Sequence, residues 1–220
     1  MAPFGKIYTY PNNGRVQRIQ AIANMSGLEI EFPEFQMGVS NKTEEFLAKF
    51  PLGKVPAFEG ADGFCLTESS AIAYYVANSG SKADQLLGSD PQTQAQIYHW
   101  SVFSETELAT AISPPIYMLV FKFMPVDEAR INSSMQMTER VFKSLEASLK
   151  GGKKYLVGDQ LTMADIMVNS FFYFAFKYMV DAELRKEIPN VVAYAQAFAT
   201  MPEHKALFGE LEMCEKRLSL

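Results

Sequence analysis

A proline stands at the entry to a predicted strand in the segment FPLGKVPAF, residues 50–58. Because proline has no N–H to give to a sheet, Pro56 is expected at an edge or a bulge. If the Val55–Pro56 bond is cis, the N–H and C=O groups of Val55 turn outward and can pair with a bound peptide. The segment therefore favours a peptide-binding edge that includes Lys54, Val55 and Pro56.

A second chemical feature follows in the run Thr67-Glu68-Ser69-Ser70, where a predicted strand leads into a helix. Backbone N–H groups at a helix N-terminus, together with the Ser69 hydroxyl, can bind a carboxylate. Glu68 beside them can accept a hydrogen bond from an ammonium group. An edge proline and an ordinary helix cap would explain either feature alone. The two in this order favour a site for a peptide with a free α-amino-acid group, such as γ-glutamyl-cysteinyl-glycine.

Residues 1–79 carry the strand and helix signals needed to position these groups. Alternating β-forming residues predict strands, and apolar residues at helical spacing predict helices. The predicted strands cover residues 6–10, 28–32, 55–58 and 64–67, and the predicted helices cover residues 15–26, 43–50 and 71–76. The order β-α-β-α-β-β-α is that of a thioredoxin-like domain, here without the redox Cys-x-x-Cys pair.

The remainder of the chain is predicted to be helical. Residues 80–91 are polar and contain glycine, so we expect a linker there, followed by an all-helical domain over residues 92–220. Pro114-Pro115 is expected to break or bend one long helix of that domain. Thr162 and Asp165 are spaced as a capping box at the start of an apolar helix. The predicted fold class is an α/β thioredoxin-like N-terminal domain plus an all-α C-terminal domain.

Composition narrows the class of function. The chain has 220 residues, of which 48% are hydrophobic and 20% charged, so it is expected to fold into packed domains. Its net charge of −5 argues against a nucleic-acid or anionic-membrane surface. Two distant cysteines make neither a disulfide framework nor a metal site, which favours a cytoplasmic protein without a metal.

Three segments in this order, FPxGKVPAF, TESxAIAYY and LTxAD, resemble those of glutathione transferases. More narrowly, five stretches are similar to the N-terminal domain of elongation factor 1 gamma subunits: residues 7–11, 54–64, 71–76, 155–158 and 214–216. The similarity extends over nearly the whole chain. It implies the two-domain glutathione-transferase fold, glutathione as co-substrate and a homodimer.

The resemblance also implies which residues bind glutathione. Five positions match glutathione-binding positions of theta-like transferases, and a sixth, Asn41, falls where those enzymes often have a His or Gln that contacts the glycine carboxylate. The implied glutathione-binding residues are thus Asn41, Lys54, Val55, Pro56, Glu68 and Ser69.

The implied catalytic position departs from the family pattern. Theta-like enzymes place a serine after the first strand, where this chain has Pro11, and neither this turn nor the strand before it contains Ser or Cys. The turn at residues 11–14 is loosely similar to a turn in fungal transferase relatives in which an asparagine meets the sulfur. The first candidate is therefore Asn13, with Tyr8 and Tyr10 as alternatives, although strand packing would explain at least one of these tyrosines.

Two functions follow from these expectations. The first is a transferase that binds glutathione and conjugates its thiol to small electrophiles. The alternative is a non-catalytic assembly domain that binds other elongation-factor subunits. The glutathione clamp favours the enzyme, whereas the missing serine and the likeness to the gamma subunit favour the assembly domain.

Overall fold

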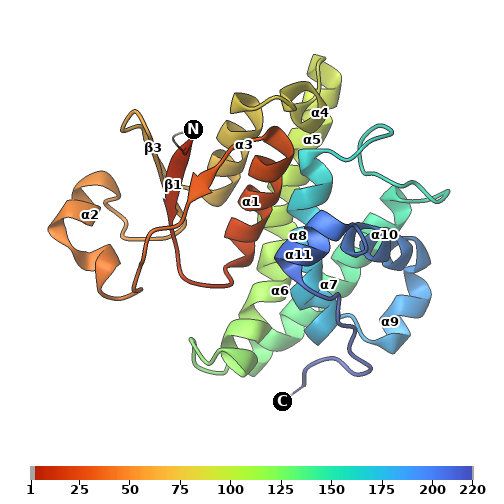
Figure 1. The fold of residues 1–220 in the computed structure, drawn as a ribbon. Coiled ribbons are helices and arrows are strands. Elements are labelled where there is room, and N and C mark those ends of the chain that lie inside the picture. The colour runs from red at the N-terminus through yellow and green to blue at the C-terminus, as the bar shows by residue number, and fades with distance from the viewer. Residues whose placement is uncertain (1–2, 220) are drawn as a thin grey trace. The chain divides into compact units, whose positions relative to one another are not determined.

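The computed structural model describes residues 3–219, which form two compact units (Figure 1). Unit 1 extends to Ser89, and unit 2 begins at Asp90. Unit 1 contains a sheet with helices, and unit 2 is helical, so the predicted fold class is confirmed. No helix in the described part of the chain combines the length and apolar character needed to cross a bilayer.

Unit 1 is built on a four-stranded sheet in the order β2-β1-β3-β4. Its strands are β1 (Gly5–Tyr8), β2 (Ile30–Glu31), β3 (Ala57–Gly60) and β4 (Cys65–Leu66). β1 runs parallel to β2 and antiparallel to β3, which pairs antiparallel with β4. β1 ends two residues earlier than predicted, so Tyr10 lies beyond the sheet.

The helices of unit 1 lie on both faces of this sheet (Figure 1). They are α1 (Gly14–Ser26), α2 (Glu44–Lys49) and α3 (Ser69–Ser79), with a 3-10 turn η1 (Ser40–Lys42) before α2. Ile7 of β1 is fully buried, as are Ile22 of α1 and Ile72 of α3, while Tyr8 makes ring contacts with Phe46 of α2. The alternation of side chains along β1 thus directs successive residues to opposite layers.

Residues 80–91, predicted as a linker, contain a further helix, α4 (Ala83–Leu87). Leu86 is fully buried and Leu87 is nearly so. Burial of this apolar pair accounts for the helix. Because the surrounding residues are polar, the sequence shows no helical periodicity of apolar residues here. The boundary between the units falls after Ser89.

Unit 2 consists of helices throughout. They are α5 (Pro91–Phe103), α6 (Ala109–Pro115), α7 (Glu128–Ser148), α8 (Met163–Tyr178), α9 (Ala182–Glu187), α10 (Pro189–Ala199) and α11 (Pro202–Phe208). Two π-helical turns, η2 (Ser104–Leu108) and η3 (Ile116–Val120), flank α6. Pro114 and Pro115 lie inside α6 and do not break the helical run. The departures from α-helical hydrogen bonding fall instead in the π turns on either side of α6.

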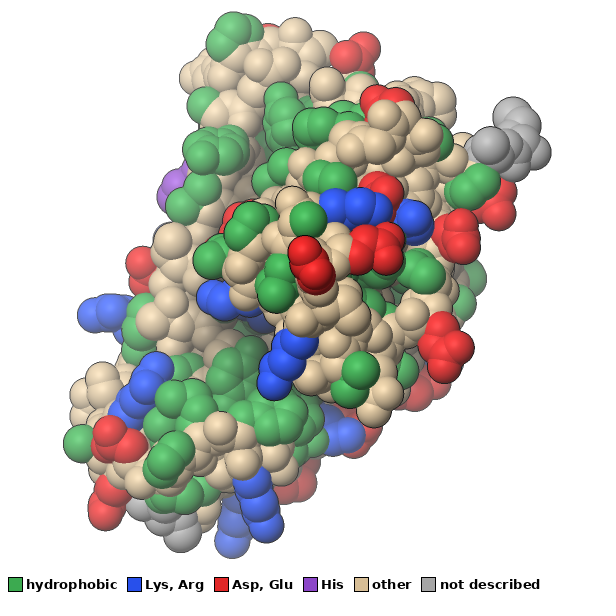
Figure 2. Space-filling model, turned by 90° about the vertical axis from the view of Figure 1, so that its left-hand side faces the viewer, with side chains coloured by type: hydrophobic (Ala, Val, Ile, Leu, Met, Phe, Trp, Pro, Cys, Tyr) green, Lys and Arg blue, Asp and Glu red, His purple; other side chains and the backbone are tan. Residues whose placement is uncertain are grey.

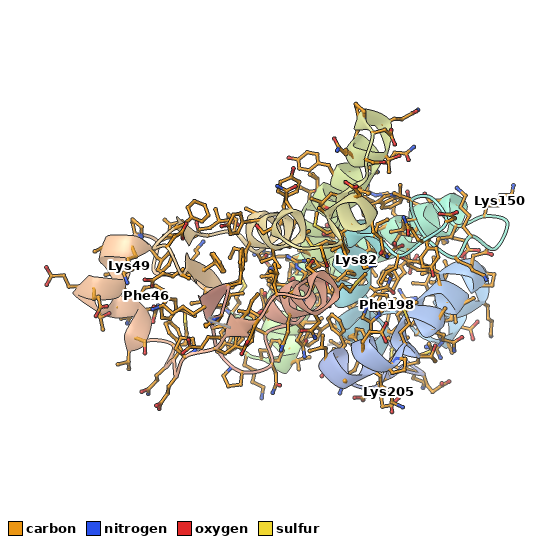
Figure 3. The ribbon with its side chains drawn as sticks, turned by 45° about the horizontal axis from the view of Figure 1, so that its top comes forward. Phe46, Lys49, Lys82, Lys150, Phe198 and Lys205 are labelled. Atoms are coloured by element: carbon orange, nitrogen blue, oxygen red, sulfur yellow. The ribbon has the colours of Figure 1, made fainter. Side chains whose placement is uncertain are left out.

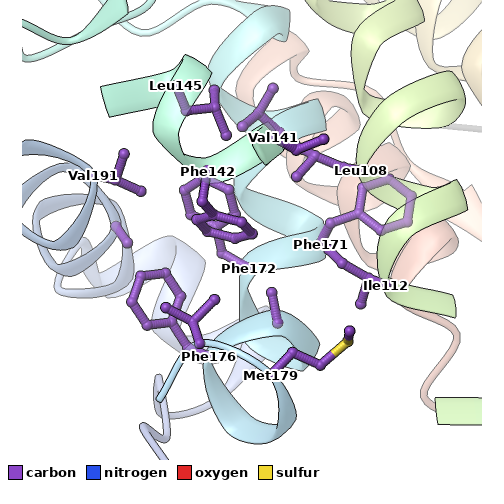
Figure 4. Packing of buried hydrophobic residues seen from close by; sticks show 14 of the residues in the cluster. Leu108, Ile112, Val141, Phe142, Leu145, Phe171, Phe172, Phe176, Met179 and Val191 are labelled. Carbon is purple, nitrogen blue, oxygen red and sulfur yellow. The ribbon is translucent and has the colours of Figure 1, made fainter. Parts of the chain in front are cut away.

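The core of unit 2 forms around α8, which is apolar on all sides. Phe172 and Phe176 of α8 are fully buried and make ring contacts with Phe142 of α7 (Figure 4). An all-round apolar helix of this kind belongs at the centre of a helical domain. The prediction that the apolar stretch beginning at Met163 is a buried helix is confirmed.

Asp165 fixes the start of α8. Its carboxylate accepts hydrogen bonds from the backbone N–H of Thr162 at 2.9 Å and from the Thr162 hydroxyl at 3.2 Å, so the predicted capping box is confirmed. It also accepts from the backbone N–H of Leu156 and from the Tyr194 hydroxyl, both at 2.8 Å. One buried carboxylate therefore joins the start of α8 to the preceding loop and to α10.

Candidate functional site

One end of the sheet of unit 1 brings the turn after β1 next to the predicted peptide edge. Tyr8 is the last residue of β1 to pair with β3, and its partner is Ala57. Thr9 and Tyr10 follow this pair on one strand, and Pro56 and Val55 precede it on the other, at the same end of the sheet. The turn that was predicted to be catalytic therefore lies beside the segment that was predicted to bind a peptide.

The hairpin of β3 and β4 brings the second predicted feature to the same end. Phe58 pairs with Leu66, and Pro56 and Glu68 each lie two residues beyond this pair toward the open end of the hairpin. Because α3 begins at Ser69, its N-terminal N–H groups also lie at this end. The two chemical features found in the sequence thus lie at the same end of the β3–β4 hairpin.

The backbone around Val55 lies outside the sheet ladder. The Val55–Pro56 peptide bond is cis, and ladder pairing of β3 begins only at Ala57. Val55 is half-buried and Lys54 is exposed. A ligand with an extended backbone can therefore pair with Val55 without displacing a strand.

Glu68 has an unusual backbone conformation for a residue with a side chain. Its φ is 67° and its ψ is 111°, and its side chain makes no capping bond to α3. A positive φ at a non-glycine residue costs on the order of 1–3 kcal/mol and is typical of functional sites. The conformation leaves an exposed carboxylate at the start of a helix, where it does not cap that helix.

Ser69 is held by a buried arginine. Nη2 of Arg18, a fully buried residue of α1, donates to the Ser69 hydroxyl at 2.7 Å. A hydroxyl that accepts one hydrogen bond can still donate its own proton. Ser69 is therefore oriented by Arg18, with a donor remaining for a carboxylate.

Asn41 is buried, and both ends of its side-chain amide are bonded within the protein. Its Oδ1 accepts from the backbone N–H of Gly38 at 2.6 Å, and its Nδ2 donates to the backbone C=O of Gly53 at 2.8 Å. Gly53 has a φ of 58°, and a Cβ there would lie 3.0 Å from the backbone oxygen of Asn41. Asn41 thus anchors the residue directly before the Lys54–Pro56 edge.

Asn13, the first catalytic candidate, caps α1. Its Oδ1 accepts from the backbone N–H of Arg15 at 3.1 Å, and its Nδ2 donates to the Thr9 hydroxyl at 3.2 Å. The side chain is nearly buried, and an amide nitrogen has two protons, of which this contact uses one. The Asn13 amide therefore stiffens the turn between β1 and α1.

Tyr8 and Tyr10 lie in different surroundings. The Tyr8 hydroxyl donates to Glu59 at 2.8 Å, and burial together with this carboxylate raises the pKa of Tyr8. Burial opposes ionisation of Glu59, but hydrogen bonds from Lys49 and Tyr8 hold its pKa below the usual value. Tyr10 is 44% exposed and lies beyond the end of β1.

A small cavity of about 190 Å³ lies on the α2 side of the Tyr8 ring. Phe46 and Lys49, both on α2, are among its lining residues and are labelled in Figure 3. The Tyr8 ring packs on Phe46 and Phe50 with centroids 5.5 and 5.9 Å apart. Tyr8 therefore belongs to an aromatic cluster between α2 and the sheet. This agrees with the expectation that strand packing explains at least one of the two tyrosines.

Both halves of the chain match models of one protein family. Residues 3–78 match "Glutathione S-transferase, N-terminal domain", and residues 100–202 match "Glutathione S-transferase, C-terminal domain". The glutathione S-transferase-like protein LUC7 of Fusarium sp is 44% identical over 209 residues, which cover 95% of this chain and 94% of that protein. The chain belongs to the glutathione S-transferase family.

Relatives of this family member include elongation factors 1-gamma. Elongation factor 1-gamma-A of Xenopus laevis is 39% identical over 219 residues, which cover 96% of this chain but only 48% of that protein. Among solved structures, the GST-like domain of elongation factor 1-gamma from Saccharomyces cerevisiae has a TM-score of 0.82 at 27% identity. That match covers 100% of this chain and 99% of the solved chain. The resemblances stated in the sequence analysis are thus confirmed.

The candidate site of this glutathione S-transferase family member includes a residue that the sequence analysis missed, Arg18. A signal was present, because Arg18 is one helical turn before Ile22, and residues four apart share a helix face. A charged residue on the buried face of α1 needs a polar partner. Which residue supplies that partner could not be deduced, because Ser69 is 51 positions away.

Proposed function

We propose that the chain binds glutathione at the open end of the β3–β4 hairpin and conjugates its thiol to small electrophiles. Membership of the glutathione S-transferase family supports the proposal at the level of chemistry. The observation that supports it for this chain is the β3–β4 pairing, because Pro56 and Glu68 each lie two residues beyond the Phe58–Leu66 pair at the open end of the hairpin.

Each part of glutathione finds a matching group in this proposal. The backbone of Val55 pairs with the cysteinyl residue, and Lys54 attracts the glycine carboxylate. The Ser69 hydroxyl and the N–H groups at the start of α3 donate hydrogen bonds to the γ-glutamyl carboxylate. Glu68 accepts from the γ-glutamyl ammonium. Asn41, whose amide is bonded to Gly38 and Gly53, contributes by holding the loop in place.

Thiolate stabilisation is assigned to the turn after β1. A cysteine thiol with a pKa near 8.5 needs help to ionise at neutral pH, and each unit of lowering requires about 1.4 kcal/mol. The second N–H of Asn13, the Tyr10 hydroxyl and the N-terminus of α1 are the candidate groups in this turn. Tyr8 is the weakest of the three side-chain candidates, because its hydroxyl donates to Glu59.

Aromatic side chains form an apolar patch within unit 2. Phe121 is 40% exposed and Phe123 is 76% exposed, and their rings stack at 5.4 Å next to Tyr117. Figure 2 shows one face of the molecule, on which hydrophobic side chains lie among charged and polar ones. Exposed aromatic groups of this kind commonly mark binding surfaces.

We also propose a homodimer. Tyr74 of α3 and Tyr98 of α5 are 51% and 66% exposed, so both rings are accessible to a second copy of the chain. Symmetric pairs that cover such surfaces are the commonest assembly of soluble proteins.

The binding part of the proposal is tested by calorimetry with Glu68→Ala. Glutathione should bind the unmodified protein, and the variant should lose about 1.5–3 kcal/mol of binding free energy, typical of a hydrogen bond to a charged group. Glu31→Ala serves as the control, because Glu31 is exposed on β2 at the opposite edge of the sheet. Equal affinities for the unmodified protein and Glu68→Ala, or no binding by either, would refute the site.

The catalytic part is tested by conjugation assays on Asn13→Ala, Tyr10→Phe and Tyr8→Phe. The rate should rise with pH as the thiolate forms. Asn13→Ala or Tyr10→Phe should raise the pKa of the bound thiol and lower kcat/KM about tenfold for each 1.4 kcal/mol lost. Tyr8→Phe should leave both nearly unchanged. If all three variants keep the original rate and thiol pKa, the turn after β1 is not the catalytic site.

A second candidate function is a non-catalytic assembly domain that binds elongation-factor subunits. It is favoured by the 39% identity to elongation factor 1-gamma-A and by the bonded state of the Asn13 amide. Glutathione binding without conjugation of any common electrophile would select this function.

A further inference from the structure

Unit 2 contains a cavity of about 450 Å³ that the proposed function does not use. It is lined by Gln92, Ala95, Gln96, His99, Trp100, Lys153, Leu156, Val157 and Gly158. Its volume lies within the range of about 300–1,000 Å³ that is typical of small-molecule sites. We call it the Trp100 cavity. All of its residues belong to unit 2, whereas the proposed glutathione site lies in unit 1.

One wall of the Trp100 cavity is a single face of α5. Gln92, Gln96, His99 and Trp100 follow one another at helical spacing, so their side chains emerge on the same side. The Trp100 ring is held edge-on against His99 and Phe103, each at a centroid distance of 5.1 Å. Trp100 also packs against the hydrophobic core of unit 2. The cavity thus has an aromatic ring in a fixed position.

The opposite wall is a loop that is tied to the core. Leu156 donates its backbone N–H to the buried carboxylate of Asp165 at 2.8 Å, and Val157 is only 4% exposed. Both walls are therefore held by buried groups. A cavity whose walls are fixed can bind a ligand without first ordering its own residues.

Charge determines the class of ligand. The lining residues include Lys153, two glutamine amides and His99, but no carboxylate. In the part of the chain that the structure describes, Lys153 forms no ion pair. The nearby Asp90 already accepts from the backbone N–H groups of Gln92 and Thr93, each at 3.0 Å. The cavity therefore presents one unneutralised cation and amide donors beside a flat ring.

We propose that the Trp100 cavity binds a small aromatic carboxylate. The ligand ring packs against Trp100, since aromatic rings attract one another in offset or edge-to-face contact. Its carboxylate pairs with the Lys153 ammonium, and the amides of Gln92 and Gln96 donate further hydrogen bonds. Lys153 alone would bind any anion, and Trp100 alone would bind any flat apolar group. Together they favour a ligand that is both flat and anionic. This site is independent of glutathione.

The test is calorimetric titration of the full chain with 2-naphthoate, compared with 2-naphthamide, its neutral analogue of the same shape. We expect one saturable site for 2-naphthoate and at least about tenfold weaker binding of the amide, as one lost charge-assisted bond would give. Trp100 is the only tryptophan in the chain, so its emission should fall along the same binding curve.

Two lysine variants complete the test. Lys153→Met should remove the preference for the carboxylate, whereas Lys150→Met should not. Lys150, labelled in Figure 3, comes from the same turn region but is not a lining residue. Saturating glutathione should leave 2-naphthoate affinity unchanged. Absence of binding, equal affinities for Lys153→Met and the unmodified protein, or displacement of 2-naphthoate by glutathione would each overturn the proposal.

Discussion

Asp165→Ala is expected to lower the free energy of unfolding of unit 2 by about 3–5 kcal/mol, because a buried hydrogen-bonded charge would be lost and its donors left unsatisfied. Asp165 has no exposed surface. Its carboxylate accepts from the backbone N–H groups of Leu156 and Thr162, and from the hydroxyls of Thr162 and Tyr194. Urea unfolding followed by the fluorescence of Trp100, which lies in unit 2, would measure the loss.

Two further variants make this test specific. Asp165→Asn keeps one acceptor oxygen but turns N–H donors toward the donors that the other oxygen bonded, so it should also lose stability. Asp159→Ala, at an exposed aspartate in the same loop, should change stability by no more than about 0.5 kcal/mol. A loss below about 1 kcal/mol for Asp165→Ala would mean that water or a rearranged loop replaces its hydrogen bonds.

Asn41→Ala should lower the stability of unit 1 by about 2–4 kcal/mol, since it leaves two backbone groups without their partners. These groups are the N–H of Gly38 and the C=O of Gly53. Gly53 directly precedes the Lys54–Pro56 edge, so glutathione affinity should also fall, by about tenfold or more. Thermal unfolding by circular dichroism and calorimetry with glutathione, at a temperature where the variant is folded, would measure the two effects.

Asn41→Asp tests whether the two hydrogen bonds of Asn41 are required, or only a polar side chain at this position. It retains an acceptor for Gly38, but it places a second acceptor against the carbonyl of Gly53, so it should be as harmful as alanine. Asn24→Ala, at an exposed asparagine of α1, is the matched control and should have almost no effect. If Asn41→Ala kept both the stability and the affinity of the unmodified protein, the anchoring role of Asn41 would be wrong.

Local signals allowed most of the fold to be predicted. Helical and strand periodicities predicted the element order of unit 1, and the spacing of Thr162 and Asp165 predicted the start of α8. These features depend on residues that are close in sequence. The helix α4 was missed because only two apolar residues, Leu86 and Leu87, indicate it.

The residues of the candidate site were proposed from the sequence, but their hydrogen bonds were not. Val55, Pro56, Glu68 and Ser69 were found as motifs, and the β3–β4 pairing brings both motifs to one end of the hairpin. The contacts of Arg18 with Ser69 and of Asn41 with Gly53 join residues that are 51 and 12 positions apart. Side-chain pairing at such separations is set by the packed structure, and periodicity alone does not reveal it.

At Glu68, the stability of the folded state and the proposed binding of a ligand make opposite demands on the residue. Glycine adopts a positive φ at little cost, so relaxing this position would favour the folded state while removing the carboxylate that the proposed site requires. Selection for thermal stability alone is therefore expected to favour glycine at position 68. Such a selection would remove the carboxylate proposed to accept from the ligand ammonium. Variants at this position should therefore be selected for glutathione affinity and thermal stability together.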